Sequence, residues 1–245
     1  NTIQGAGATT VTAQNGIQFY EAGGTLTGTI SNNTIDGIAY DNTSASTKWV
    51  ATSILNYFAT ADIIGNTVTG GHVGIYNYDG EGSVNDNDLT IEKIGVYAFG
   101  IIASDPPFIK DSPYVEELWA DESSQETPLK LGTLTVDLSG NTVAFSGPDN
   151  SATYGIEVDV GFGPNDMAFS AVDNVVTGFE MGFEFYNCQS SCSTGVLTAA
   201  SVNNNQLTGN DYGVWSNVDY FTVDAEYNWW GDVSGPSGEG PGTGD

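Results

Sequence analysis

The feature that most constrains the fold is a short phrase that recurs along the chain. In it, an asparagine is followed eight residues later by a glycine that opens an apolar run. Four copies share this spacing: Asn66 to Gly74, Asn87 to Gly95, Asn174 to Gly182 and Asn205 to Gly213. Looser copies begin at Asn1, Asn33 and Asn141, and an incomplete one at Asn228. A repeat that varies in length while its phrases persist is typical of a solenoid, because each turn contacts only its neighbours.

The recurring phrases have the character of strands. The first and third residues after the glycine are mostly apolar, as in Ile17 and Phe19 or Ile156 and Val158, which is the two-residue period of a strand. No window gives a convincing amphipathic helix, and glycine, asparagine, threonine and serine interrupt every run. A β-sandwich or propeller is the rival architecture, but clean hairpin signals are missing. We therefore predict an all-β parallel β-helix, with coils about 4.8 Å apart.

The recurring asparagine has a physical role in such a fold. Asparagine tolerates the left-handed bend between two sheets, and its amide can bond to the equivalent amide on the next coil. We therefore expect a buried asparagine ladder along one corner. Its predicted members are Asn33, Asn66, Asn87, Asn141, Asn174 and Asn205.

These motifs resemble the right-handed parallel β-helix repeat family, a pectate-lyase-like superfold. The final stretch, AEYNWWGDVSGPSGEGPGTGD, is similar to the terminal motif of such domains in large secreted and cell-surface proteins of bacteria and archaea. The resemblance implies about eight irregular coils over residues 1–235, a long insertion near residues 104–132 and a Gly/Pro-rich linker or tail at 236–245. It also implies a secreted, extracellular or cell-surface location. The family includes lyases, hydrolases, epimerases, adhesins and structural proteins, so the fold alone does not give the function.

The charge of the chain narrows the possible partners. Thirty-one acidic residues face four basic ones, all lysines, for a net charge of -27. Nucleic acids and anionic membrane surfaces both require clustered cations, so we expect neither as a partner. The chain contains no run of 18 apolar residues, so we do not expect it to insert into a membrane. Lyases and epimerases of the resembled family typically use arginine or lysine as the base or to neutralise charge. This chain departs from that pattern, because it has no arginine and only four lysines.

One acidic segment is the candidate cation site. The stretch YDGEGSVNDND contains the four candidate ligands Asp79, Glu81, Asp86 and Asp88. Calcium accepts carboxylates and backbone carbonyls in irregular loops, so it is the cofactor that this segment would bind. The alternatives are solvated surface carboxylates, or a pair of catalytic carboxylates in a hydrolase.

Aromatic residues form the candidate binding surface. If the residue after each glycine points inward, the second and fourth residues after it point outward. Tyr76, Tyr78, Tyr97 and Phe99 occupy such positions and would lie together on adjacent coils. Grouped, exposed aromatic rings mark a surface that binds sugar rings or another subunit. The alternative is that the insertion near residues 104–132 folds back and covers them.

The two cysteines, Cys188 and Cys192, lie four residues apart in a polar stretch. A disulfide between them would fit an oxidising compartment, and free thiols are the alternative. Zinc is not expected, because the chain has a single histidine and a zinc site needs four ligands.

These observations leave two functional hypotheses. The first is a non-catalytic structural or adhesive β-solenoid module of a surface layer, filament or adhesin, which self-associates into rods. The alternative is a carbohydrate-active module that binds or hydrolyses a neutral glycan. Of the two, the residues favour the non-catalytic role.

Overall fold

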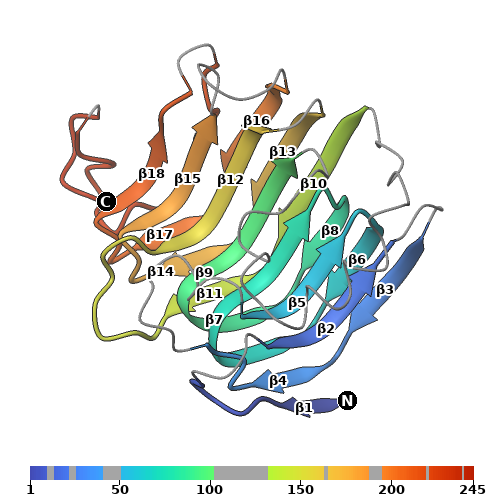
Figure 1. Ribbon diagram of the computed structural model, residues 1–245. Coiled ribbons are helices and arrows are strands. Elements are labelled where there is room, and N and C mark those ends of the chain that lie inside the picture. Colours follow the sequence, from blue (N-terminus) through green and yellow to red (C-terminus); the bar gives the residue numbers. More distant parts are fainter. Residues whose placement is uncertain are drawn as a thin grey trace.

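The computed structural model describes residues 1–9, 14–21, 26–40, 51–101, 132–162, 165–187, 195–218, 221–238 and 240–245. Within these ranges the regular structure consists of strands, and every named strand pair is parallel. Figure 1 shows the strands side by side from the N-terminal end (blue) to the C-terminal end (red). The chain is therefore all-β, with the fold of a parallel β-helix. Cys188, Cys192 and residues 104–131 of the predicted insertion lie outside the described residues.

Equivalent strands of successive coils pair to form three faces. The first face follows the recurring asparagines and contains β1 (Thr2–Gln4), β4 (Thr34–Asp36), the starts of β7 (Thr67–Tyr78) and β9 (Asp88–Ile101), β11 (Thr142–Phe145), β14 (Val175–Thr177) and β17 (Gln206–Thr208). The second face contains β2 (Asn15–Tyr20), β5 (Thr52–Tyr57), the ends of β7 and β9, β12 (Tyr154–Phe162), β15 (Met181–Asn187) and β18 (Tyr212–Ser216). The third face contains β3 (Thr27–Ser31), β6 (Thr60–Ile64), β8 (Gly82–Asn85), β10 (Thr133–Ser139), β13 (Asp166–Val172) and β16 (Leu197–Asn203).

The core lies between these faces and is built of stacked aliphatic rows. On the second face, the residue that follows each recurring glycine points inward. Ile75, Val96, Ile156 and Phe183 are in register from coil to coil and have no exposed surface. The two-residue period thus places apolar side chains inside and alternate positions outside, as predicted.

The six predicted ladder asparagines lie on one corner, between the third face and the first. From Asn33 to Asn205, each side-chain Nδ2 donates to the Oδ1 of the next asparagine over 2.8–3.0 Å. The ladder continues at both ends, to Asn1 and to Asn228. The six side chains are buried, so these bonds satisfy amides that have lost water.

The left-handed bend is not made by the ladder asparagines themselves, which corrects one expectation. The residue before each of the six has positive φ: Asn32, Gly65, Asp86, Gly140, Asp173 and Asn204. Glycine, asparagine and aspartate tolerate this conformation best. The bend thus falls on the preceding residue, which leaves the ladder asparagine free to bond along the column.

The Gly/Pro-rich segment at residues 236–245 has backbone partners in the structure. Pro236 and Gly244 form a β-bridge, and the amide of Asp245 donates to the carbonyl of Trp230 over 2.8 Å. The Asp245 carboxylate accepts from the backbone amide of Asn210 in the last coil over 2.9 Å. This segment therefore folds onto the final coil, because its backbone groups find partners there.

Among the described residues, no helix is long and apolar enough to cross a bilayer.

Candidate functional site

The four predicted surface aromatics do lie together, on the outward side of the second face. Tyr76 and Tyr78 come from β7, and Tyr97 and Phe99 from β9. The Tyr76 and Tyr97 rings stack with centroids 4.7 Å apart. However, all four side chains are buried, with at most 6% of their surface exposed. The prediction that these four side chains are exposed is therefore wrong.

Ring stacking extends along the solenoid. Tyr20, Tyr57 and Tyr78 form a second stack, with centroids 4.7 and 4.8 Å apart and nearly parallel planes. In such a stack each ring presents its face to the ring on the next coil, and its edge points away from the sheet. The faces that would pack against a sugar are thus occupied by neighbouring rings. The stacked rings therefore link each of these coils to the next one.

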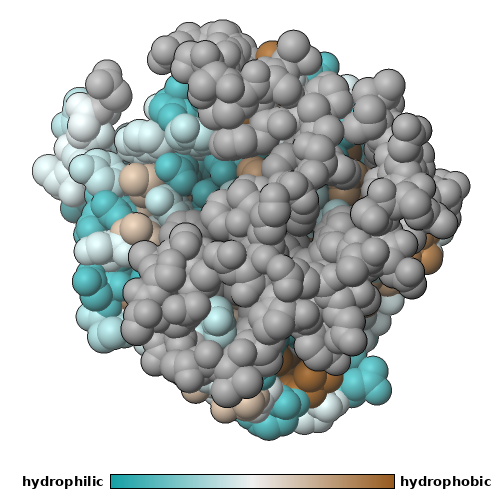
Figure 2. Space-filling view, viewed as in Figure 1, coloured by the Kyte–Doolittle hydropathy of each residue, from teal (hydrophilic) through white to brown (hydrophobic). Residues whose placement is uncertain are grey.

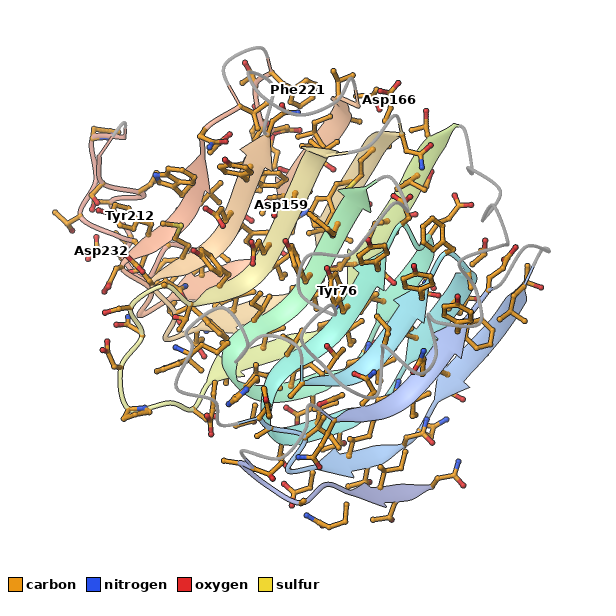
Figure 3. All side chains as sticks on the ribbon, in the orientation of Figure 1. Tyr76, Asp159, Asp166, Tyr212, Phe221 and Asp232 are labelled. Atoms are coloured by element: carbon orange, nitrogen blue, oxygen red, sulfur yellow. The ribbon has the colours of Figure 1, made fainter. Side chains whose placement is uncertain are left out.

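Both aromatic rows end in carboxylates on the next coil. In register, Tyr97 is followed by Glu157 and Phe99 by Asp159, both on β12. Glu184 on β15 continues the row of Glu157. Figure 3 shows Tyr76 and Asp159 on this face of the sheet. We call Glu157, Asp159 and Glu184 the acidic group.

The acidic group is deeply placed for carboxylates. Its three members are only 6–7% exposed. Carboxylates at this depth are normally paired with a cation or fully hydrogen-bonded. In the part of the chain that the structure describes, no basic side chain forms an ion pair with any of the three. Figure 2 shows mainly hydrophilic surface beside the β15 and β18 end of this face.

Hydrogen bonding distinguishes the members of the acidic group. The Tyr97 hydroxyl donates to Oδ2 of Asp159 over 2.6 Å. By contrast, Oδ1 of Asp159, Oε2 of Glu157 and the Tyr76 hydroxyl are buried and have no hydrogen-bond partner within the described part of the chain. Buried polar atoms without partners are uncommon and costly, so these atoms are candidates for proton transfer or ligand contact.

The environment raises the pKa of each of the three carboxyls. Burial raises the pKa of Asp159 to about 7, although the Tyr97 hydrogen bond opposes the rise. Burial, followed by the charges of Asp159 and Glu184, raises the pKa of Glu157 well above its ordinary value. Burial, with the charges of Asp159 and Glu180, raises the pKa of Glu184 to about 7. Near neutral pH, the group therefore contains both a carboxylic acid and a carboxylate.

The predicted calcium ligands do not form one cluster. Asp79 is buried and accepts a hydrogen bond from Nδ2 of Asn165 over 3.3 Å. Asp86 and Asp88 are exposed, on either side of the ladder residue Asn87. Among the described residues, no three His, Cys, Asp or Glu side chains are grouped so that they could hold a metal ion. Calcium binding by Asp79, Glu81, Asp86 and Asp88 stays a prediction.

Comparisons with known proteins add no relative. No protein-family model matches the chain, and no curated protein and no solved structure is significantly similar to it. The fold therefore rests on the strand pairing and the ladder, and the function rests on the geometry of the second face.

Proposed function

We propose that this protein is a carbohydrate-active β-helix that hydrolyses a glycan at the acidic group. One observation carries the proposal: Glu157 and Asp159 are buried on one side of β12, and each has a carboxyl oxygen without a hydrogen-bond partner among the residues that the structure describes. Glycoside hydrolysis needs two carboxyl groups, one protonated and one ionised. The raised pKa values of the group supply both forms near neutral pH.

The position of the two carboxyls on one strand supports this chemistry. Glu157 and Asp159 are two residues apart on β12, so both side chains point to the same side of the sheet. A pair of carboxyl groups on one side of a strand can act on a glycosidic bond as the acid and the base. Elimination is supported less, because it requires a cationic base or a charge neutraliser, and the chain has no arginine.

The charge of the molecule favours a neutral glycan. A net charge of -27 repels polyuronates and other acidic polysaccharides. Aromatic residues continue beyond the acidic group on the last coil, where Trp215 is in register with Glu184 and Tyr212 with Met181. Tyr212 is 52% exposed. Sugar contacts are therefore proposed for the β18 end of the second face.

The test uses the intact chain and a panel of neutral glycans: xylan, mannan, starch, cello-oligosaccharides and a β-1,3-glucan. New reducing ends are expected from one of them with the natural protein, and not with a Glu157→Gln/Asp159→Asn variant. An Asp86→Asn/Asp88→Asn variant is the control, since these carboxylates are exposed outside the acidic group. Absence of hydrolysis across the panel would overturn the proposal.

The asparagine ladder favours a second candidate, a structural or adhesive module at the cell surface. Its eight asparagines join every coil from Asn1 to Asn228, and the aromatic stacks add a second column. Such coupling makes a stiff rod, whose acidic exterior would keep it soluble in salt. Electron microscopy of the native material tests this role: filaments support it, and isolated molecules count against self-association.

A further inference from the structure

The two central carboxyls of the acidic group differ in one contact. Asp159 receives the Tyr97 hydroxyl, whereas Oε2 of Glu157 is buried and has no hydrogen-bond donor among the described residues. A hydrogen bond donated to a carboxylate stabilises the ionised form, and it is stronger when the acceptor is charged. The contact thus favours the ionised form of Asp159 over that of Glu157, although the two side chains are buried to the same extent.

The Tyr97 hydroxyl is held in place by packing. Its ring stacks on Tyr76 at 4.7 Å and lies against Phe99 at 5.2 Å. Tyr97 is also in register with Glu157, one strand away from the carboxylate to which it donates. The ring therefore cannot swing away without breaking the aromatic rows. The stacks that join the coils also fix the donor.

Other ionisable groups surround the pair. They come from the elements packed on both sides of β12 and from β12 itself: Tyr76 on β7, Tyr97 on β9, Tyr154 on β12 and Glu184 on β15. Burial raises the pKa of each of these tyrosines, so they stay neutral near pH 7. Of these groups, Tyr97 donates a hydrogen bond to the Asp159 carboxylate.

We propose that Tyr97 is a positioning residue that divides the labour of the site, making Asp159 the ionised base and leaving Glu157 as the proton donor. This rests on the proposed hydrolysis. Glu157 gives its proton to the glycosidic oxygen as the bond from that oxygen to the anomeric carbon breaks. Asp159 takes a proton through Oδ1 from the water whose oxygen forms the new bond to that carbon. One water is consumed, and solvent returns the proton from Asp159 to Glu157.

The test is a titration that needs no substrate. Carboxyl carbons are labelled with ¹³C in Asp and Glu, and their chemical shifts are followed by NMR against pH. In the natural protein, Asp159 is expected to lose its proton at lower pH than Glu157. The opposite order would overturn the proposal, whether or not any variant folds.

Tyr97→Phe removes the hydroxyl and keeps the stacked ring. The pKa of Asp159 is expected to rise by about 1–2 units, the equivalent of one hydrogen bond to a charged group. Tyr76→Phe is the matched control, because this neighbour in the same stack donates to no carboxylate. It should move the pKa of Asp159 much less. Equal shifts in the two variants, or none, would overturn the role of Tyr97.

The same variants separate this inference from the proposed function. If the protein hydrolyses a glycan, Tyr97→Phe should move the acidic limb of the rate profile to higher pH, because that limb reports the base. A protein that shows the NMR order but hydrolyses nothing would keep the division of protons and overturn the hydrolysis.

Discussion

The ladder corner and the second face are built from the same coils, yet they differ in how much the residue type varies from coil to coil. At the corner, one residue type is kept from Asn1 to Asn228. On the outward side of the second face, aromatic residues occupy both rows on β7 and β9, and carboxylates replace them at β12. A corner that must bond to itself tolerates only asparagine, whereas the outward rows of the second face have no such requirement and are free to change. A break in such a row is therefore informative about function.

The largest expected effect concerns the carboxylates that replace the aromatic residues at β12. Glu157→Gln should slow hydrolysis of a responsive glycan by about 10²–10⁴-fold, the usual contribution of a general acid. The stability of the coil should change little at acidic pH, because a protonated glutamate and a glutamine are similar in shape. Initial rates at saturating substrate measure the effect. A variant that keeps its full rate would remove Glu157 from the chemistry.

The pH dependence of stability comes next. Asp159 has its pKa raised from 3.8 to about 7 in the folded chain, so the fold binds its proton more tightly than the unfolded chain does. The stability that this provides is complete below about pH 4 and is lost as the pH rises through 7. Three units correspond to about 4 kcal/mol as an upper figure.

Asp159→Asn should therefore flatten the stability curve and make the protein more stable than the natural chain at pH 8. Thermal unfolding across pH 4–8 measures this. Asp88→Asn, at an exposed position, is the control and should leave the curve unchanged. A natural protein whose stability rises between pH 5 and 8 would contradict the deep burial of the acidic group.

The ladder corner can be broken at its centre. Asn141→Ala removes the acceptor for both the backbone amide and the side chain of Asn87, and the donors to Asn174 and Val84. Buried donors left without partners cost about 1–3 kcal/mol each, so we expect a loss of about 3 kcal/mol or more. Chemical denaturation measures it, with Asn150→Ala, at a half-buried position outside the ladder, as control. Equal stability of the two variants would show that the column is incidental.

The smallest expected effect is that of calcium on the loop at Asp79 to Asp88. At a concentration about ten times the dissociation constant, binding to the folded chain alone adds about 1.4 kcal/mol. Adding calcium to EDTA-treated protein should therefore raise the melting temperature by a few degrees, and Asp86→Asn/Asp88→Asn should abolish the rise. Glu157→Gln should keep it. An unchanged melting temperature would remove calcium from the account.

Much of the fold could be predicted because its signals are local. The glycine at a fixed distance from each asparagine, and the apolar period that follows it, define strands and their inward side. The column from Asn33 to Asn205 followed from the same spacing. The turn conformation did not, because the choice of which residue adopts positive φ depends on how both flanking strands pair.

The site was only partly visible in the sequence. Glu157 and Asp159 occupy the second and fourth positions after Gly155, as Tyr76 and Tyr78 do after Gly74. A comparison of these positions between coils would have shown the change from aromatic to acidic. The stretch near Asp79 has the higher density of carboxylates in the sequence, and density of charge along the chain does not indicate burial.

By itself, the sequence determined the all-β solenoid, its asparagine corner and the inward side of each strand, since all three follow from spacing along one chain. Only the tertiary structure decided that the aromatic rings stack and are buried, and that Asp159 meets Tyr97 although 62 residues separate them. Burial and pKa depend on which coils become neighbours. That neighbourhood exists only once the chain has stacked upon itself.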